Sequence, residues 1–193
     1  MARKILFLGL VVLLKIGVSE AAAIPFVVQS AANSSTGGVP LATIFMAVGQ
    51  EFTVTASTND LWSLGALPRW SDANGLTGFR FATGSDESGQ PAGTQIGANF
   101  GILNQYGFSA PFGSLVGQIG TTYMVLGTNF HGNAWGTGVL YLQNWDSNSG
   151  DNSQFITAEV NAVPEPSTLL LLGSAIAAFG IRRRTLARAY ARR

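Results

Sequence analysis

The sequence contains no cysteine, so it can form neither a disulfide framework nor a thiol nucleophile. It contains one histidine, His131, which rules out a zinc site built on a histidine pair and leaves a serine triad only one possible base. A Walker loop and a Gly-x-Gly-x-x-Gly that opens a helix are also missing. These absences argue against an enzyme, and they require that packing alone stabilises the fold.

Basic residues are scarce in the middle of the chain. Of eleven Lys and Arg residues, only Arg69 and Arg80 lie between residues 24 and 163, where the sequence has eight acidic residues. Two minus eight gives this part a net charge of −6, although the whole chain carries +1. The negative sign argues against nucleic-acid binding, which needs clustered basic side chains, and is compatible with a cation site.

The first 23 residues have the features of a secretory signal peptide. Arg3 and Lys4 precede an apolar run over residues 5–14, and the segment 20–23 supplies small residues for signal peptidase. The apolar run is too short for a membrane span, which needs about twenty residues. The sequence therefore predicts export and a mature chain that begins near Ile24, with a retained anchor helix as the alternative.

The end of the chain combines a short proline motif, an uncharged apolar stretch over residues 168–181 and an arginine triplet, in that order. The flanking residues are Pro164, Glu165 and Pro166 before the stretch and Arg182, Arg183 and Arg184 after it. A marginally short apolar stretch suits a transient membrane stop better than a permanent anchor. An ordinary C-terminal anchor helix is the alternative.

This order resembles closely the PEP-CTERM sorting signal of Gram-negative bacteria, whose partner is exosortase, a membrane-embedded cysteine transpeptidase. The resemblance implies that residues 163–193 are a sorting signal with a short transmembrane helix at about 168–181 and a cytoplasmic arginine-rich tail. It also implies passage through the inner membrane, processing by exosortase, and delivery to the cell surface or to an extracellular biofilm matrix.

Between the two ends, the sequence predicts many short strands and no long helix. Glycine, asparagine and serine clusters separate segments with strand-like patterns, and helix-forming charged residues are few. The predicted strands cover residues 52–56, 115–119, 122–126, 138–142 and 155–160. This pattern indicates an all-β fold, an antiparallel β-sandwich over residues 41–162. The small residues between 24 and 40 are expected to form a linker.

The polar loop over residues 144–153 is the candidate for chemistry. It places Asp146 and Asp151 among asparagine, serine and glycine residues, and calcium prefers six to eight oxygen ligands of these kinds. The spacing does not fit an EF-hand. A plain polar hairpin loop is the alternative, because the same residues are common in turns. A second acidic pair, Asp86 and Glu87, is expected to be solvated.

Several segments together resemble the galactophilic calcium lectins of bacteria, the LecA-like family. The order and spacing of these segments match the family, and the segments are residues 49–56, 61–65, 113–120, 138–142 and 146–155. The resemblance implies a small jelly-roll-like sandwich with one calcium that bridges protein and sugar. The implied calcium ligands are the Leu64 carbonyl, Asp146, a carbonyl near Asn148 or Ser149, Asp151 and Asn152. The expected carbohydrate contacts are Asp146 and Asp151, through the ion, and Trp145, one of four tryptophans that could stack on a sugar face, with a buried core tryptophan as the alternative.

This sequence departs from the lectin pattern in two ways. The loop from Asp146 to Asp151 is about two residues shorter, and the sugar-reading His and Gln of the family have no counterpart between residues 72 and 105. Calcium is therefore better supported than galactose. The resulting hypothesis is an exported, exosortase-processed surface or matrix protein whose mature domain binds calcium and carbohydrate. The alternatives are a structural matrix protein without a ligand and a secreted hydrolase that uses carboxylates.

Overall fold

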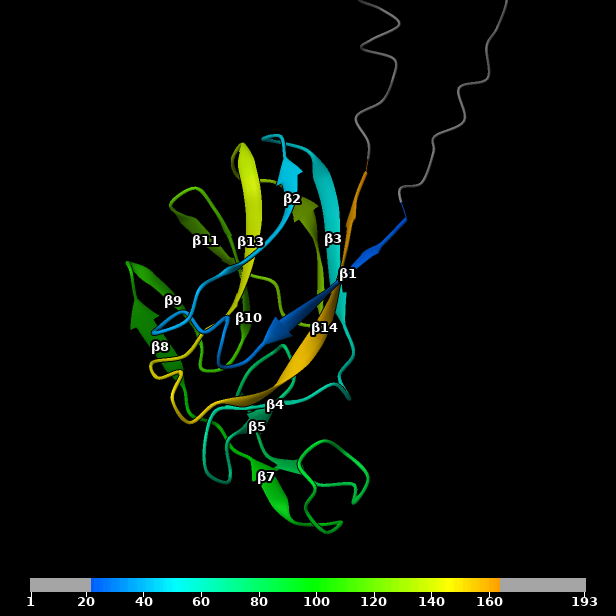
Figure 1. Cartoon of the computed structure of the whole chain (residues 1–193), viewed down its shortest axis with the longest axis vertical. Coiled ribbons are helices and arrows are strands. Elements are labelled where there is room, and N and C mark those ends of the chain that lie inside the picture. The colour runs from blue at the N-terminus through cyan, green and yellow to red at the C-terminus, as the bar shows by residue number, and fades with distance from the viewer. Residues whose placement is uncertain (1–21, 164–193) are drawn as a thin grey trace, which may run out of the picture. The chain divides into compact units, whose positions relative to one another are not determined.

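The structure is a computed structural model that describes residues 22–163. These residues form fourteen strands and no helix. Figure 1 shows how the strands are arranged. Residues 21–163 are one compact unit with its own core. The signal-peptide residues 1–21 and the sorting-signal residues 164–193 lie outside the described part, and within that part no helix is long and apolar enough to span a membrane.

Two antiparallel sheets form the sandwich (Figure 1). The first sheet has the order β12 (Asn129–Asn133), β3 (Glu51–Ala56), β14 (Ser153–Ala162), β4 (Trp62–Ser63) and β5 (Trp70–Ser71), and β1 (Ile24–Gln29) pairs with β14. The second sheet has the order β11 (Thr122–Val125), β10 (Leu115–Ile119), β13 (Gly138–Asn144) and β2 (Leu41–Met46). All five strands predicted from the sequence are confirmed, as is the antiparallel β-sandwich.

Two hairpins complete the fold at the edges of the sandwich. One contains β6 (Arg80–Phe81) and β7 (Gln95–Gly97), and the other contains β8 (Ile102–Gln105) and β9 (Phe108–Pro111). Each hairpin has its own small apolar cluster: Leu61, Ala82 and Ile96 support the first, and Ala110, Val116 and Trp145 support the second. These clusters attach the two hairpins to the sandwich.

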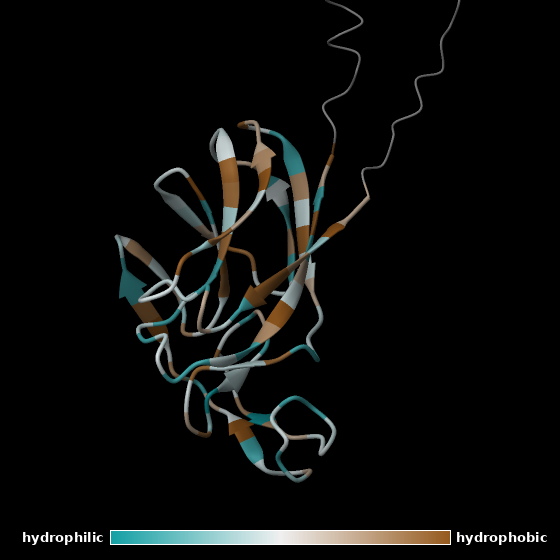
Figure 2. Cartoon of the chain, viewed as in Figure 1, coloured by the Kyte–Doolittle hydropathy of each residue, from teal (hydrophilic) through white to brown (hydrophobic). Residues whose placement is uncertain are grey.

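The core lies between the facing sheets, and Figure 2 shows the apolar bands that cross both of them. Along β14, Ile156, Ala158 and Val160 are buried at every second position, which is the period of a strand with one face in the core. Leu140 and Leu142 of β13 are buried from the opposite sheet in the same cluster. Burial of this apolar face supplies the stability that the absence of cysteine demands.

The prediction that residues 24–40 form a linker is wrong. β1 pairs with β14 over six positions, from Ile24 opposite Val160 to Gln29 opposite Phe155, and Val28 lies fully buried in the core. The residues after β1 form turns, but Ser30 and Ser34 are also fully buried. The small side chains of this segment allow it to lie against the end of the sandwich, where the sequence suggested only a flexible connection.

Candidate cation site

The end of β13 and the start of β14 bring the predicted site residues together. β13 ends at Asn144, and Asp146 lies two residues later, so both side chains continue the inward-facing positions of the strand. Asn152 immediately precedes β14, whose first residue, Ser153, pairs with Ser63 of β4. This pairing places the turn that contains Leu64 beside the 144–152 loop.

Gly65, in this turn, allows a carboxylate to approach closely. Its φ is +115°, a backbone conformation that side-chain-bearing residues rarely adopt. A Cβ added at this position would lie 2.4 Å from the Asp151 Oδ2 atom. The glycine therefore lets the Asp151 carboxylate lie directly against the turn that follows Leu64.

Asp146 is an almost completely buried carboxylate, with 2% of its surface exposed. Its backbone is held on both sides by Ser35, whose Oγ accepts from the Asp146 N–H at 2.9 Å and donates to the Asp146 carbonyl at 3.0 Å. The Oδ1 atom accepts from the Ser147 N–H at 2.7 Å, whereas Oδ2 is buried and has no hydrogen-bond partner. The carboxylate is thus fixed in place with one oxygen unsatisfied.

Burial raises the pKa of Asp146 above its ordinary value of 3.8, and repulsion from Asp151 adds to the increase. The Asn152 side chain and the backbone N–H groups of Ser147 and Asn148 act in the opposite direction without cancelling it. The Asn152 Nδ2 group also donates to the Ser30 carbonyl at 3.2 Å. The Asp146 Oδ2 atom has no hydrogen-bond partner within geometric limits. The charged form of Asp146 is therefore poorly solvated and close to a second negative charge.

Two asparagine side-chain oxygens are also buried without a hydrogen-bond donor: the Oδ1 atoms of Asn144 and Asn152. Their orientation is set by Ser30: its carbonyl can only accept, so it faces the Asn152 NH₂. Its Oγ donates to the Ser63 carbonyl at 3.0 Å, so it accepts from Asn144 Nδ2 at 2.7 Å. Both amide oxygens are consequently turned away from Ser30, and each costs about 1–3 kcal/mol if it stays unsatisfied.

Asp151 lies at the rim of the site, with 42% of its side chain exposed. It accepts a hydrogen bond from Asn148 Nδ2 at 2.7 Å and lies 3.7 Å from Arg69 Nη1. The Arg69 guanidinium also lies over the ring of Phe100, 5.4 Å from its centre. An ion pair this exposed is worth about 0–1 kcal/mol, so it leaves Asp151 available to another cation.

The donor set suits a hard cation. Within residues 22–163, no three His, Cys, Asp or Glu side chains gather in a way that could hold a metal ion. Calcium does not require such a group, because amide oxygens, backbone carbonyls and water complete its coordination. Asp146, Asp151 and Asn152 with the Leu64 turn fit this chemistry. Asn144 was not predicted, although its position two residues before Asp146 on an inward-facing strand could have indicated it.

The prediction that Trp145 contacts carbohydrate is wrong. Trp145 faces the opposite side of the chain from Asn144 and Asp146, and it is fully buried there because the β8–β9 hairpin covers it. Its ring packs against Phe108 and Tyr123, with centroids 5.4 and 5.5 Å away, and Nε1 donates to the Leu103 carbonyl at 3.0 Å. It is a core tryptophan that supports the β8–β9 hairpin.

His131 lies elsewhere, on the exposed face of β12. Its Nε2 atom is 2.6 Å from Glu51 Oε1, across the β12–β3 pair, and both side chains are more than half exposed. This pair is remote in sequence and in sheet position from the 144–152 loop. The histidine therefore contributes nothing to the candidate site.

Comparison with known proteins confirms the sorting signal. The PEP-CTERM protein-sorting motif matches residues 162–184. The chain is thus an exosortase substrate that is exported across the inner membrane to the cell surface or the extracellular space. No curated protein gives a significant match.

Among solved structures, the chain is similar to one titled "EclA N-terminal domain; PllA-like lectin". The two share 18% sequence identity with a TM-score of 0.44, and the match covers 72% of this chain and 97% of the other. The β-sandwich of this chain is defined by its own two sheets and the core between them.

Proposed function

We propose that the exported domain is a non-enzymatic binding protein that holds one calcium ion and, through it, a carbohydrate. The calcium ligands are the carboxylates of Asp146 and Asp151, the Asn152 amide oxygen and the Leu64 carbonyl. The observation that carries the proposal is that two oxygens of these ligands, Asp146 Oδ2 and Asn152 Oδ1, are buried without a hydrogen-bond donor. A cation would satisfy oxygens that hydrogen bonds leave unsatisfied.

Charge supports the same proposal. The Asp146 and Asp151 carboxylates repel each other, and Asp146 is buried where water cannot stabilise its charge. A divalent cation would replace the missing solvation and compensate both charges. Arg69, at 3.7 Å from Asp151, is too exposed to do this for Asp146.

The carbohydrate part of the proposal rests on accessibility and on the resemblance to calcium lectins. Asp151 is 42% exposed, so a sugar hydroxyl can reach it and the ion together, while Asp146 acts through the ion. The site lies at the Ser153 end of β14, and the match to the sorting motif begins at Ala162, the last residue of this strand. A ten-residue strand spans about 30 Å, so the site lies at the opposite end of β14 from Ala162.

A ligand-free structural role has one observation in its favour. Because burial raises its pKa, Asp146 could be protonated and donate to a neighbouring amide oxygen, which would satisfy both groups without a cation. The domain would then be a structural component of the matrix. The two proposals differ in whether calcium binds.

Isothermal titration of calcium into residues 22–163 tests the proposal. The expected result is one binding site per chain in the wild type, none in Asp146→Ala, and unchanged binding in Asp86→Ala, which alters an unrelated acidic loop. The proposal is contradicted if the wild type releases no heat on titration with calcium and also none with magnesium or terbium. A glycan array probed in calcium and in EDTA then tests the carbohydrate part, which fails if every bound glycan is retained in EDTA.

A further inference from the structure

We infer that the pocket between the 57–61 turn and the β6–β7 hairpin is a second, cation-independent site that binds a neutral sugar ring. The pocket has a volume of about 380 Å³, within the range of small-molecule sites. Its lining includes Asn59, Arg80, Phe81, Thr83, Ser85 and Glu87. None of these residues belongs to the candidate cation site.

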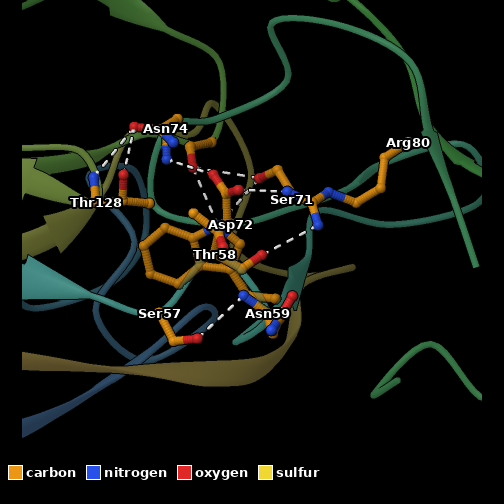
Figure 3. A network of polar contacts seen from close by, with 10 residues as sticks. Ser57, Thr58, Asn59, Ser71, Asp72, Asn74, Arg80 and Thr128 are labelled. Atoms are coloured by element: carbon orange, nitrogen blue, oxygen red, sulfur yellow. Dashed lines mark hydrogen bonds and ion pairs between the residues drawn. The ribbon is translucent and has the colours of Figure 1, made fainter. Parts of the chain in front are cut away.

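Arg80 forms a wall of the pocket that is fixed before any ligand arrives. Its Nη2 atom pairs with the Asp72 carboxylate, which is only 5% exposed, and its Nη1 donates to the Thr58 carbonyl at 3.1 Å. Figure 3 shows the Arg80 side chain with its contacts to Asp72 and Thr58. Since 31% of the Arg80 side chain is still exposed, the remaining N–H groups can donate to a ligand without rearrangement.

The opposite wall is a loop that is held by its own hydrogen bonds. Asp86 Oδ2 accepts from the Thr83 N–H at 2.5 Å and from Thr83 Oγ1 at 3.0 Å. Asp86 Oδ1 accepts from the Ser88 N–H at 3.1 Å and from Ser88 Oγ. Asp86 is thus occupied with the loop itself, while the neighbouring Glu87 side chain is exposed and can accept from a ligand hydroxyl.

Phe81 gives the pocket an apolar surface that the fold does not use. Its side chain is 56% exposed. The apolar cluster that supports the hairpin is made by Leu61, Ala82 and Ile96 and does not include Phe81. Exposing an aromatic ring among polar side chains is typical of a binding surface. The ring can stack on the C–H face of a pyranose while Asn59, Arg80 and Glu87 bond its hydroxyls.

The charges of the lining favour a neutral ligand. One guanidinium faces two carboxylates, so a strongly anionic ligand would meet Asp86 and Glu87, and a cationic ligand would meet Arg80. A purely apolar ligand would leave the polar rim without partners. A sugar ring, with one apolar face and hydroxyls around its edge, satisfies both kinds of surface. With the proposed calcium site, one sandwich would hold two saccharide segments and link them.

Nuclear magnetic resonance titrations of residues 22–163 in EDTA with cellotriose, maltotriose and galactobiose test this inference. At millimolar sugar, at least one probe is expected to shift the amide signals of residue 59 and residues 80–87. Phe81→Ala should weaken that binding by about tenfold or more, since aromatic stacking and burial are both lost. Phe79→Ala is the matched control, because Phe79 is also exposed, at 77%, but does not line the pocket.

Asp146→Asn separates this inference from the proposed function, because it removes the calcium ligand and should leave binding in EDTA unchanged. If Phe81→Ala alters the overall spectrum, Phe81→Leu keeps the hairpin apolar and still removes the aromatic face. The inference is overturned if no probe shifts these signals, if Phe79→Ala weakens binding as much as the Phe81 variants, or if Asp146→Asn abolishes binding in EDTA.

Discussion

Two acidic loops of this protein have similar compositions and opposite environments. Residues 83–88 and residues 144–152 both combine aspartate with serine and glycine, which are ordinary turn residues. The hydrogen bonds that the Asp86 carboxylate accepts from Thr83 and Ser88 lower its pKa against the effect of burial. Asp146 is buried by the sandwich, and its pKa is raised.

The difference comes from position in the fold. Asp86 lies in the loop of a peripheral hairpin, where water and its own turn solvate it. Asp146 lies two residues beyond β13, at a position that continues the inward face of a core strand. A carboxylate becomes a candidate cation ligand when the fold buries it with an unsatisfied oxygen, and the composition of its loop does not decide this.

The largest expected effect is stabilisation by calcium. Calcium at about a hundred times its dissociation constant should raise the free energy of unfolding by about 2.7 kcal/mol, because it binds only the folded site. Chemical denaturation of the wild type, Asp146→Ala and Asp86→Ala in calcium and in EDTA measures this. The increase should vanish in Asp146→Ala and persist in Asp86→Ala. Equal midpoints of the wild type in calcium and in EDTA would remove the distinction between the two loops.

In EDTA, Asp146→Asn should stabilise the domain by about 1–2 kcal/mol at neutral pH, since it replaces a buried, unsatisfied carboxylate with a neutral amide of the same shape. The same substitution then makes the protein insensitive to calcium. Urea denaturation with and without EDTA checks both effects. A loss of stability in EDTA would mean that the Asp146 charge is already compensated by groups in the apo protein.

Much of the fold could be predicted from the sequence, because the five predicted strands have alternating or apolar patterns bounded by turn residues. β1 was missed, since its six residues adjoin a small-residue segment that resembles a linker and only its pairing with β14 shows that it belongs to the sheet. Asp146 and Asp151 are candidate ligands from the composition of their loop, and the family resemblance adds Asn152 to the candidates. Asn144 continues the alternation of β13 and could have been found from that pattern. The prediction for Trp145 failed because the sequence does not show which elements cover a side chain just beyond the end of a strand.

The next largest effect is expected in the pH dependence of stability, which should have opposite signs for Asp146 and Asp86. The raised pKa of Asp146 means that the apo protein binds a proton there more readily than the unfolded chain does, so in EDTA its stability should rise as the pH falls toward 3.8. The slope for one group is at most about 1.4 kcal/mol per pH unit. In calcium the same proton competes with the ion, so affinity should fall over that range. Unfolding of the wild type relative to Asp146→Asn at several pH values measures both, and parallel curves in EDTA would contradict the raised pKa.

The smallest effect is expected from Asp86→Asn. The amide has only one acceptor oxygen, so it can keep the hydrogen bonds from Thr83 or those from Ser88 but not both. The loop should therefore lose about 1 kcal/mol of stability, in calcium and EDTA alike. The lowered pKa of Asp86 gives this contribution a defined pH range: it is present above the unfolded value of 3.8 and is lost as the pH falls through the lower folded pKa. The wild type and Asp86→Asn should therefore converge in stability only in strong acid. A difference between them that depends on calcium would show that the 83–88 loop also senses a cation, and the contrast with the 144–152 loop would then fail.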